Sequence, residues 1–267
     1  MIIKVTIASI LIIALIIFLS VESIRNKLTF YPDAHGEIPV QNMPGHVSER
    51  EIATTDGEKL HALLFKHEEV KRSLIIYFHG NAGNLYGRLG FVQPLFEMGH
   101  DVLLVSYRGY SKSTGKPNEK GIYTDGEAAV SYAINELGIS ENDITIFGRS
   151  LGTTVATHIS QGRDFNRVVL VTPLTSGKEM ASAMGLGWAK FLAGNSFNSV
   201  EKMSNIKAKI LIIHGDQDEL TPYAMGKKLM DTFIGDKRMV TIKGGGHNDL
   251  QEVDPVLFWG ELQKFLE

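Results

Sequence analysis

The sequence contains no cysteine among its 267 residues. Disulfides, cysteine-ligated zinc, iron–sulfur clusters and a cysteine nucleophile are therefore excluded together. The absence leaves the cellular compartment open, because a chain without cysteine tolerates both oxidising and reducing surroundings. A chain of this length can bury a large hydrophobic core without such cross-links.

The sequence also lacks a large excess of positive or negative charge. The chain has 27 basic and 30 acidic residues, a formal net charge of −3, and no long run of either sign. A nucleic-acid partner would leave a basic stripe, so we expect none. Internal repeats and low-complexity tracts are missing as well, and a hydrophobic content of 43% is ordinary for a packed domain. These features predict one folded domain.

The N-terminal region is the exception to this composition. Val5 to Val21 contains no charged residue, and as a helix it would span roughly 25 Å at about 1.5 Å per residue. With Lys4 snorkelling at one end, the segment reaches the ~30 Å hydrocarbon core of a bilayer. It predicts a transmembrane anchor over residues 1–24 and a single-pass membrane protein. We expect an irregular juxtamembrane segment over residues 25–45.

A cleaved signal peptide is the alternative interpretation of this run. Its best cleavage site, Val21-Glu22-Ser23, fits the usual small-x-small pattern poorly. Lys4 flanks one side, whereas Arg25 and Lys27 flank the other. Because basic residues lie on both sides, the sequence leaves the orientation in the membrane open.

Short apolar runs alternate with segments of helical periodicity over residues 46–267. Runs that are apolar on both faces are typical of parallel strands covered by helices. We therefore expect an α/β fold with a mostly parallel sheet of about eight strands and helices on both faces. The predicted strands are Leu60–His67, Leu74–Phe78, Val102–Tyr107, Ile144–Phe147, Val168–Val171, Ile210–Ile213 and Met239–Ile242, and Asp56-Gly57 is the turn of a leading hairpin.

One pentapeptide has the pattern of a catalytic turn. Gly148-Arg149-Ser150-Leu151-Gly152 follows the apolar run Ile144–Phe147 and precedes a helical pattern near Thr153. Strand, sharp turn and helix form the setting of a nucleophile elbow, in which Ser150 would be exposed at the carboxyl end of the sheet. A glycine-rich turn without chemical meaning is the alternative.

A serine nucleophile needs a base, and three histidines follow Ser150. His158 falls within the helix after the turn and is expected to face away, and His214 ends a strand and is expected to be structural. His247 follows the last predicted strand in a glycine-rich loop that can carry the imidazole over the edge of the sheet. His247 is therefore the predicted base.

The acid that orients the base must lie between the serine and the histidine in this chain order. Asp216 and Asp218 both follow a predicted strand, in His214-Gly215-Asp216-Gln217-Asp218. Asp216 suits a turn, since aspartate bonds its own backbone two residues on. Spacing favours Asp218 only modestly.

An oxyanion also needs donors, and backbone N–H groups in a tight loop supply them well. His79-Gly80-Asn81-Ala82-Gly83-Asn84 follows a predicted strand. The N–H groups of Asn81 and Leu151 are the pair we predict. An ordinary strand–helix turn is the alternative interpretation of this loop.

Together these segments, with Tyr107-Arg108-Gly109-Tyr110 and Gly246-His247-Asn248-Asp249, resemble the α/β-hydrolase superfamily. The likeness extends over the whole globular part and is greatest to a membrane-anchored branch related to lysophospholipases and protein depalmitoylases. The resemblance implies that the second aspartate of H-G-x-x-D, Asp218, is the acid, and it implies no cofactor or metal. Ser106 departs from the pattern, because relatives often carry aspartate there, which puts the local loop in question.

The predicted activity is hydrolysis of a carboxylic ester or thioester by Ser150, His247 and Asp218. The substrate would be a small-molecule or lipid acyl ester, or an acylated protein.

A small cap is expected at about residues 174–208, and its apolar side either packs on the core, lines an acyl site or touches the bilayer. A peptidase of the same fold and a membrane-tethered binding protein without catalysis are the alternatives. The sequence leaves the oligomeric state open. The apolar residues of the cap are Met180, Met184, Leu186, Trp188, Phe191 and Leu192.

Overall fold

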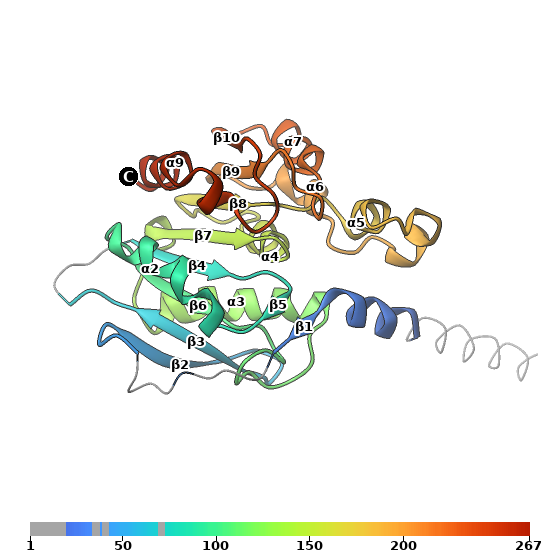
Figure 1. Ribbon diagram of the computed structural model, residues 1–267. Coiled ribbons are helices and arrows are strands. Elements are labelled where there is room, and N and C mark those ends of the chain that lie inside the picture. Colours follow the sequence, from blue (N-terminus) through green and yellow to red (C-terminus); the bar gives the residue numbers. More distant parts are fainter. Residues whose placement is uncertain (1–19, 34–37, 39–42, 69–72) are drawn as a thin grey trace, which may run out of the picture.

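Eight strands form one sheet at the centre of the molecule in the order β10-β9-β8-β7-β4-β6-β3-β2. The structure is a computed structural model that describes residues 20–33, 38, 43–68 and 73–267 (Figure 1). The strands are β2 (Val47–Ala53), β3 (Lys59–Phe65), β4 (Leu74–Phe78), β6 (Asp101–Val105), β7 (Ile144–Arg149), β8 (Arg167–Val171), β9 (Lys209–Gly215) and β10 (Lys237–Ile242).

Neighbouring strands from β10 to β6 are parallel, and β3 joins β6 and β2 in antiparallel pairs. The β2–β3 pair is the predicted leading hairpin, and Gly57 takes a φ of 93° in its turn. This arrangement confirms the predicted mostly parallel sheet of about eight strands. The carboxyl ends of the parallel strands lie at one edge, where loops can carry functional side chains.

Helices cover both faces of this sheet. α3, α4, α6 and α7 contribute to the core on one face, and α2 and α9 to the core on the other. Their bounds are α2 (Leu89–Glu97), α3 (Glu119–Asn135), α4 (Gly152–Ile159), α5 (Gly177–Ala183), α6 (Ser199–Met203), α7 (Tyr223–Thr232), α8 (Leu250–Val253) and α9 (Pro255–Leu266), with 3₁₀ helices η2 (Tyr86–Arg88), η3 (Glu141–Asp143) and η4 (Gly187–Ala193).

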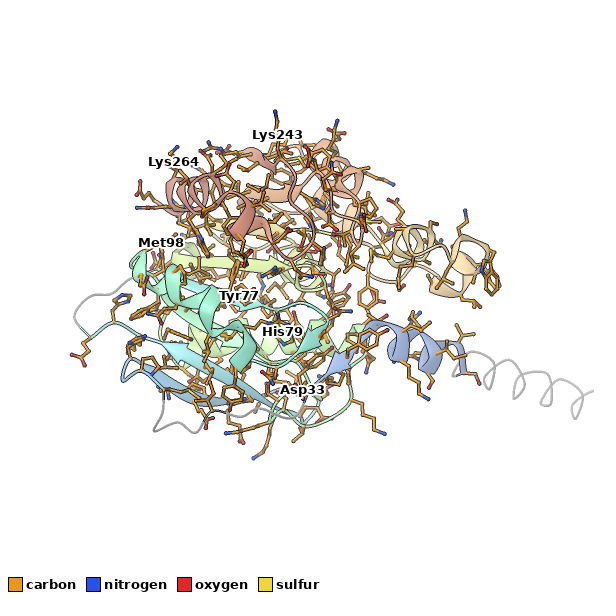
Figure 2. The ribbon with its side chains drawn as sticks, in the orientation of Figure 1. Asp33, Tyr77, His79, Met98, Lys243 and Lys264 are labelled. Carbon is orange, nitrogen blue, oxygen red and sulfur yellow. The ribbon has the colours of Figure 1, made fainter. Side chains whose placement is uncertain are left out.

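Strand β4 explains why the interior has two cores. Leu74, Ile76 and Phe78 belong to one hydrophobic cluster, whereas Ile75 and Tyr77 belong to the other. Successive side chains of a strand point to opposite faces, so a strand covered on both sides is apolar throughout. Figure 2 shows Tyr77 within the molecule, whereas Lys243 and Lys264 project outward at the surface.

The N-terminal region differs from the sequence-based expectation of irregular backbone. Residues 20–29 are helical, and a short strand β1 (Tyr31–Pro32) then pairs in parallel with β5 (Ala82–Gly83). Sequence periodicity could not predict this helix and strand, because tertiary contacts fix the segment. Phe30 is buried, and its ring meets that of Phe197 edge to face with the two ring centroids 6.2 Å apart. The segment therefore packs on the domain that contains the sheet.

The predicted anchor lies almost wholly outside the described residues, which begin at Ser20. Within the described ranges, no helix has the length and apolar character to cross a bilayer. The anchor therefore stays a prediction from the sequence.

Candidate active site

Ser150 lies at a tight turn that requires glycine at positions 148 and 152. It links β7 to α4 with a φ of 52°, a conformation that L-residues rarely adopt. A Cβ at Gly152 would lie 2.1 Å from the Phe78 carbonyl oxygen, and one at Gly148 would lie 2.6 Å from the Gly152 oxygen. The backbone N–H of Ser150 donates to Val171 O at 2.9 Å, which ties the turn to β8. The strand, sharp turn and helix predicted around Ser150 are therefore present.

The three residues predicted as nucleophile, base and acid lie within hydrogen-bond distance of one another. His247 Nε2 is 2.9 Å from Ser150 Oγ, and His247 Nδ1 is 2.8 Å from Asp218 Oδ2. Asp218 follows β9, and His247 follows β10 in the loop before α8. Such a chain can accept a proton from the serine hydroxyl and stabilise the resulting imidazolium.

The Asp218 carboxylate is held by donors on both oxygens. Oδ1 accepts from the backbone N–H groups of Leu220 at 2.9 Å and Thr221 at 2.8 Å, and Oδ2 accepts from Thr221 Oγ at 2.8 Å. Burial acts to raise the pKa of Asp218, but hydrogen bonds from His214, His247 and Thr221 together hold that pKa well below its ordinary value. Asp218 is therefore a charged carboxylate at neutral pH.

Asp216, the other acid that spacing left open, has a different task. Its Oδ1 accepts from the Gly244 N–H at 2.7 Å, and so it holds the glycine-rich loop that carries His247. Arg149 supports the same loop by donating to Asn248 O at 3.1 Å. Asp216 thus shapes the loop, and Asp218 contacts the imidazole.

Sequence reasoning missed two residues beside the acid. His214, expected to be structural, is fully buried with its Nε2 3.2 Å from Asp218 Oδ2 and 2.8 Å from Thr221 O. The Thr221 hydroxyl lies 3.1 Å from His247 Nδ1 as well. The signal in the sequence was the position of His214 at the start of H-G-x-x-D. His158, expected to face away, stacks on Tyr123 at 4.0 Å, outside this group.

The predicted oxyanion loop runs beside Ser150. A Cβ at Gly80 would lie 3.5 Å from Ser150 Cβ. Asn81 O accepts from the Tyr31 N–H at 2.9 Å and from Tyr110 Oη at 2.6 Å, and Asn81 Nδ2 donates to Thr29 O at 3.1 Å. Within the described part of the chain, the N–H groups of Asn81 and Leu151 have no protein acceptor. Both N–H groups are therefore available to a ligand.

Neutral groups fix the start of this loop. His79 lies at the end of β4 (Figure 2), fully buried, with its Nδ1 2.7 Å from Gly80 O. Burial lowers the pKa of His79 to about 3, so the imidazole is uncharged at neutral pH. Tyr107 Oη donates to His79 O at 2.9 Å. A neutral imidazole and a neutral phenol thus fix the first residues of the loop, and Arg88 donates to Ala82 O further along it.

The Ser106 position, where related sequences often carry aspartate, is well held. The Ser106 N–H donates to His61 O at 2.9 Å. Arg108 donates from its backbone and from Nε to the buried Asp125 carboxylate, each at 2.8 Å. Burial raises the pKa of Asp125 to about 6, against the lowering effect of Arg108. An aspartate at 106 is therefore not needed to order this loop.

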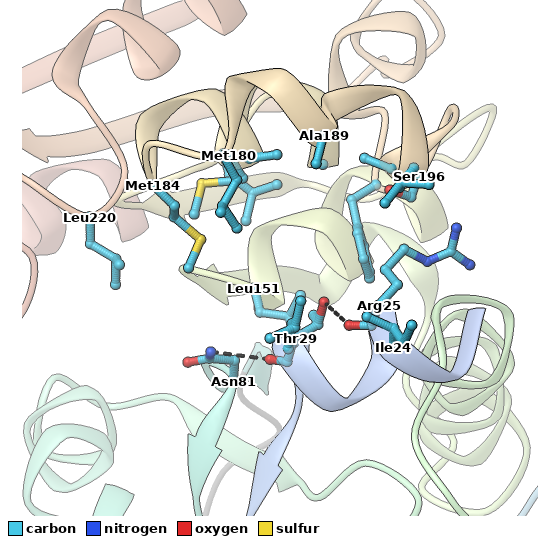
Figure 3. A pocket seen from close by; sticks show the side chains of 18 of the residues that line it. Ile24, Arg25, Thr29, Asn81, Leu151, Met180, Met184, Ala189, Ser196 and Leu220 are labelled. Atoms are coloured by element: carbon cyan, nitrogen blue, oxygen red, sulfur yellow. Dashed lines mark hydrogen bonds between the residues drawn. The ribbon is translucent and has the colours of Figure 1, made fainter. Parts of the chain in front are cut away.

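A cavity of about 440 Å³ opens above Ser150. One side is the helical segment 20–29, and the other is the cap formed by α5 and η4 (Figure 3). Among the apolar cap residues, Met180, Met184, Leu186 and Leu192 line the cavity. Trp188 and Phe191 point outward instead, with 78% and 71% of their surfaces exposed. Such a volume with an apolar lining is typical of a small-molecule site.

No metal site accompanies this arrangement within the described ranges, where no three His, Asp or Glu side chains are grouped to hold an ion. The sheet, the elbow and the Ser–His–Asp contacts have the arrangement of the α/β-hydrolase class of fold.

Comparison with known proteins agrees with this class. Residues 73–198 match the family model described as alpha/beta hydrolase fold, and residues 186–255 match one described as TAP-like protein. An esterase structure from Pyrococcus furiosus has a TM-score of 0.74 at 19% identity and covers 89% of this chain and 96% of its own. The chain has the α/β-hydrolase fold.

Two relatives in sequence cover much of the chain. An uncharacterized protein of Mycobacterium tuberculosis is 28% identical over 255 residues, which is 94% of this chain and 90% of that protein. Alpha/beta hydrolase domain-containing protein 17B of Homo sapiens is 29% identical over 199 residues, covering 74% and 68% of the two chains.

The two aspartates can be separated by the reactivity of Ser150 toward a fluorophosphonate. Asp218→Asn should slow labelling by about ten-thousand-fold, because the imidazole loses the carboxylate that orients it. Asp216→Asn should slow it by less than about tenfold, since the asparagine Oδ1 can still accept from the Gly244 N–H, and even the loss of that bond would cost only roughly 1 kcal/mol. The reverse order of rates would show that Asp216 is the acid.

Tyr110→Phe removes one of the two donors to Asn81 O. The turnover of a soluble ester should fall by about three- to tenfold with little change in KM, because the Tyr31 N–H still holds the loop. Steady-state kinetics on the folded variant check this, and Tyr132→Phe, near the C-terminal end of α3, is the control. An unchanged kcat would mean that this hydroxyl does not position Asn81.

Proposed function

We propose that the protein is a membrane-anchored serine hydrolase that cleaves a carboxylic ester or thioester of an acyl chain. Ser150 is the nucleophile, His247 the base and Asp218 the acid that orients it. The observation that carries the proposal is the Ser150–His247–Asp218 chain, with distances of 2.9 Å and 2.8 Å, at the floor of an apolar cavity.

In the first half of the reaction, His247 Nε2 takes the Ser150 hydroxyl proton while Oγ attacks the acyl carbonyl carbon. The negative charge moves to the carbonyl oxygen, which the Asn81 and Leu151 N–H groups stabilise. His247 then gives its proton to the departing alkoxide or thiolate, and an acyl-enzyme on Ser150 remains.

In the second half, water takes the place of the leaving group. His247 accepts a proton from the water as its oxygen attacks the acyl carbon. The new tetrahedral intermediate collapses, Ser150 Oγ recovers the proton, and the carboxylic acid departs. No cofactor or metal enters either half.

The lining of the cavity favours an acyl substrate over a peptide. Of the described residues that line it, Arg25 is the sole charged one and none is acidic. A site for a free amino terminus would need a carboxylate partner, whereas an apolar wall suits a hydrocarbon chain. The name of the Pyrococcus furiosus relative, an esterase, agrees with this preference.

Ser150→Ala tests the nucleophile. We expect it to abolish fluorophosphonate labelling and ester turnover while the thermal unfolding midpoint changes little, because the hydroxyl contacts mainly His247. Gel fluorescence and a thermal melt measure both, with Ser111→Ala as a matched control at another serine of positive φ. Undiminished turnover by the folded Ser150→Ala protein would refute the mechanism.

The membrane anchor rests on the uncharged run Val5 to Val21. Full-length protein should stay in the membrane fraction through a high-salt or alkaline wash, because buried apolar residues rather than surface charge retain it. A chain without residues 1–19 should leave that fraction. Soluble full-length protein with a new N-terminus near Ile24 would mean that a signal peptide is cleaved instead.

A further inference from the structure

The N-terminal helical segment, residues 20–29, presents one row of side chains to the cavity above Ser150. Val21, Ile24 and Leu28 line it, at the spacing that places residues on one face of a helix. Ile24 and Leu28 keep 55% and 53% of their surfaces exposed. An apolar row at this spacing normally packs on a core, yet here it borders an open space.

This wall is held firmly against the domain. Phe30 anchors the end of the segment in the core, where it meets Phe197. The next residue, Tyr31, donates its N–H to Asn81 O, and Thr29 O accepts from Asn81 Nδ2. The segment is therefore fixed to the same loop that offers an N–H beside Ser150, so its row of side chains has a defined distance from the nucleophile.

The facing wall belongs to the cap. Met180, Met184 and Leu192 border the same cavity from α5 and η4, and Figure 3 shows Met180 and Met184 across from Ile24 and Thr29. Methionine side chains adapt to irregular apolar partners. The space between the two walls runs from Ser150 along the helical segment. From Leu28 back to Val21 the segment measures roughly 10 Å at about 1.5 Å per residue.

We infer that the substrate's acyl chain lies between the segment 20–29 and the cap, so that Ile24 and Leu28 determine which acyl chains the enzyme accepts. This inference rests on the proposed serine hydrolase activity. The occupant is a hydrocarbon chain because Ser150 opens into the groove and both walls are mostly apolar, with Arg25 as the sole charged residue among the described residues that line them. The segment that leads out of the predicted anchor is then also part of the substrate site.

The test compares two alkyl fluorophosphonates, ethyl and dodecyl, on full-length protein in phosphatidylcholine vesicles. Both probes label Ser150, and the ratio of the dodecyl to the ethyl rate reports the groove without need for turnover. The ratio should fall about tenfold in Ile24→Ala/Leu28→Ala, since both truncations remove apolar surface that the dodecyl chain would cover and the ethyl group would not. Leu28→Trp, which fills the groove, should lower the ratio as well.

Lys27→Ala is the matched control, because Lys27 is an exposed residue of the same segment that does not line the cavity. Its ratio should equal that of the wild type. Ile24 and Leu28 are half-exposed, so their truncation should leave the fold intact.

A wild-type ratio in both groove variants would overturn the inference and leave the proposed function standing. An equal loss with both probes would also overturn it, since the segment would then support Ser150 and not the chain. A dimer that the groove variants abolish, with no change in ratio, would mean that a second copy covers the groove. Failure of both probes to label wild-type protein would refute the proposed function itself.

Discussion

The turn at Ser150 is possible only because Phe78 and Gly152 approach each other without a side chain between them. A Cβ at Gly152 would lie 2.1 Å from the Phe78 carbonyl oxygen. This contact brings the end of β4 against the turn that follows β7, so the Asn81 loop and Ser150 lie side by side. The φ of 52° at Ser150 is tolerated because the neighbouring strands and α4 fix the turn on every side.

Donors on both oxygens of Asp218 keep this carboxylate charged beside His247. Two backbone N–H groups and the Thr221 hydroxyl accompany the imidazoles around Asp218. A buried carboxylate with several donors remains ionised, whereas one without them would take up a proton. His79, which follows β4, is kept neutral by burial.

The sheet, Ser150 and His247 were predictable from local pattern. Apolar runs such as Leu74–Phe78 identified strands because both faces are covered, and Ser150 and His247 follow strand ends in the expected order. Spacing in the sequence could not decide between Asp216 and Asp218, because the decision depends on where each side chain points after the turn. The resemblance to the hydrolase family chose Asp218, which the structure places against His247.

The contacts of residues 29–31 could not be predicted, because they join segments fifty or more residues apart in the sequence. Thr29 and Tyr31 meet Asn81 through single hydrogen bonds, and Phe30 fills a gap in the core that no periodicity reveals.

These contacts bear on the two interpretations of the N-terminus. Cleavage at Val21-Glu22-Ser23 would remove Val21 from the cavity wall and leave Ile24 at a free chain end, where helices fray. An uncleaved segment keeps the helix continuous up to Val21 and so preserves the wall opposite the cap. The geometry of the groove thus gives a reason, independent of hydropathy, for the segment to stay attached to the domain.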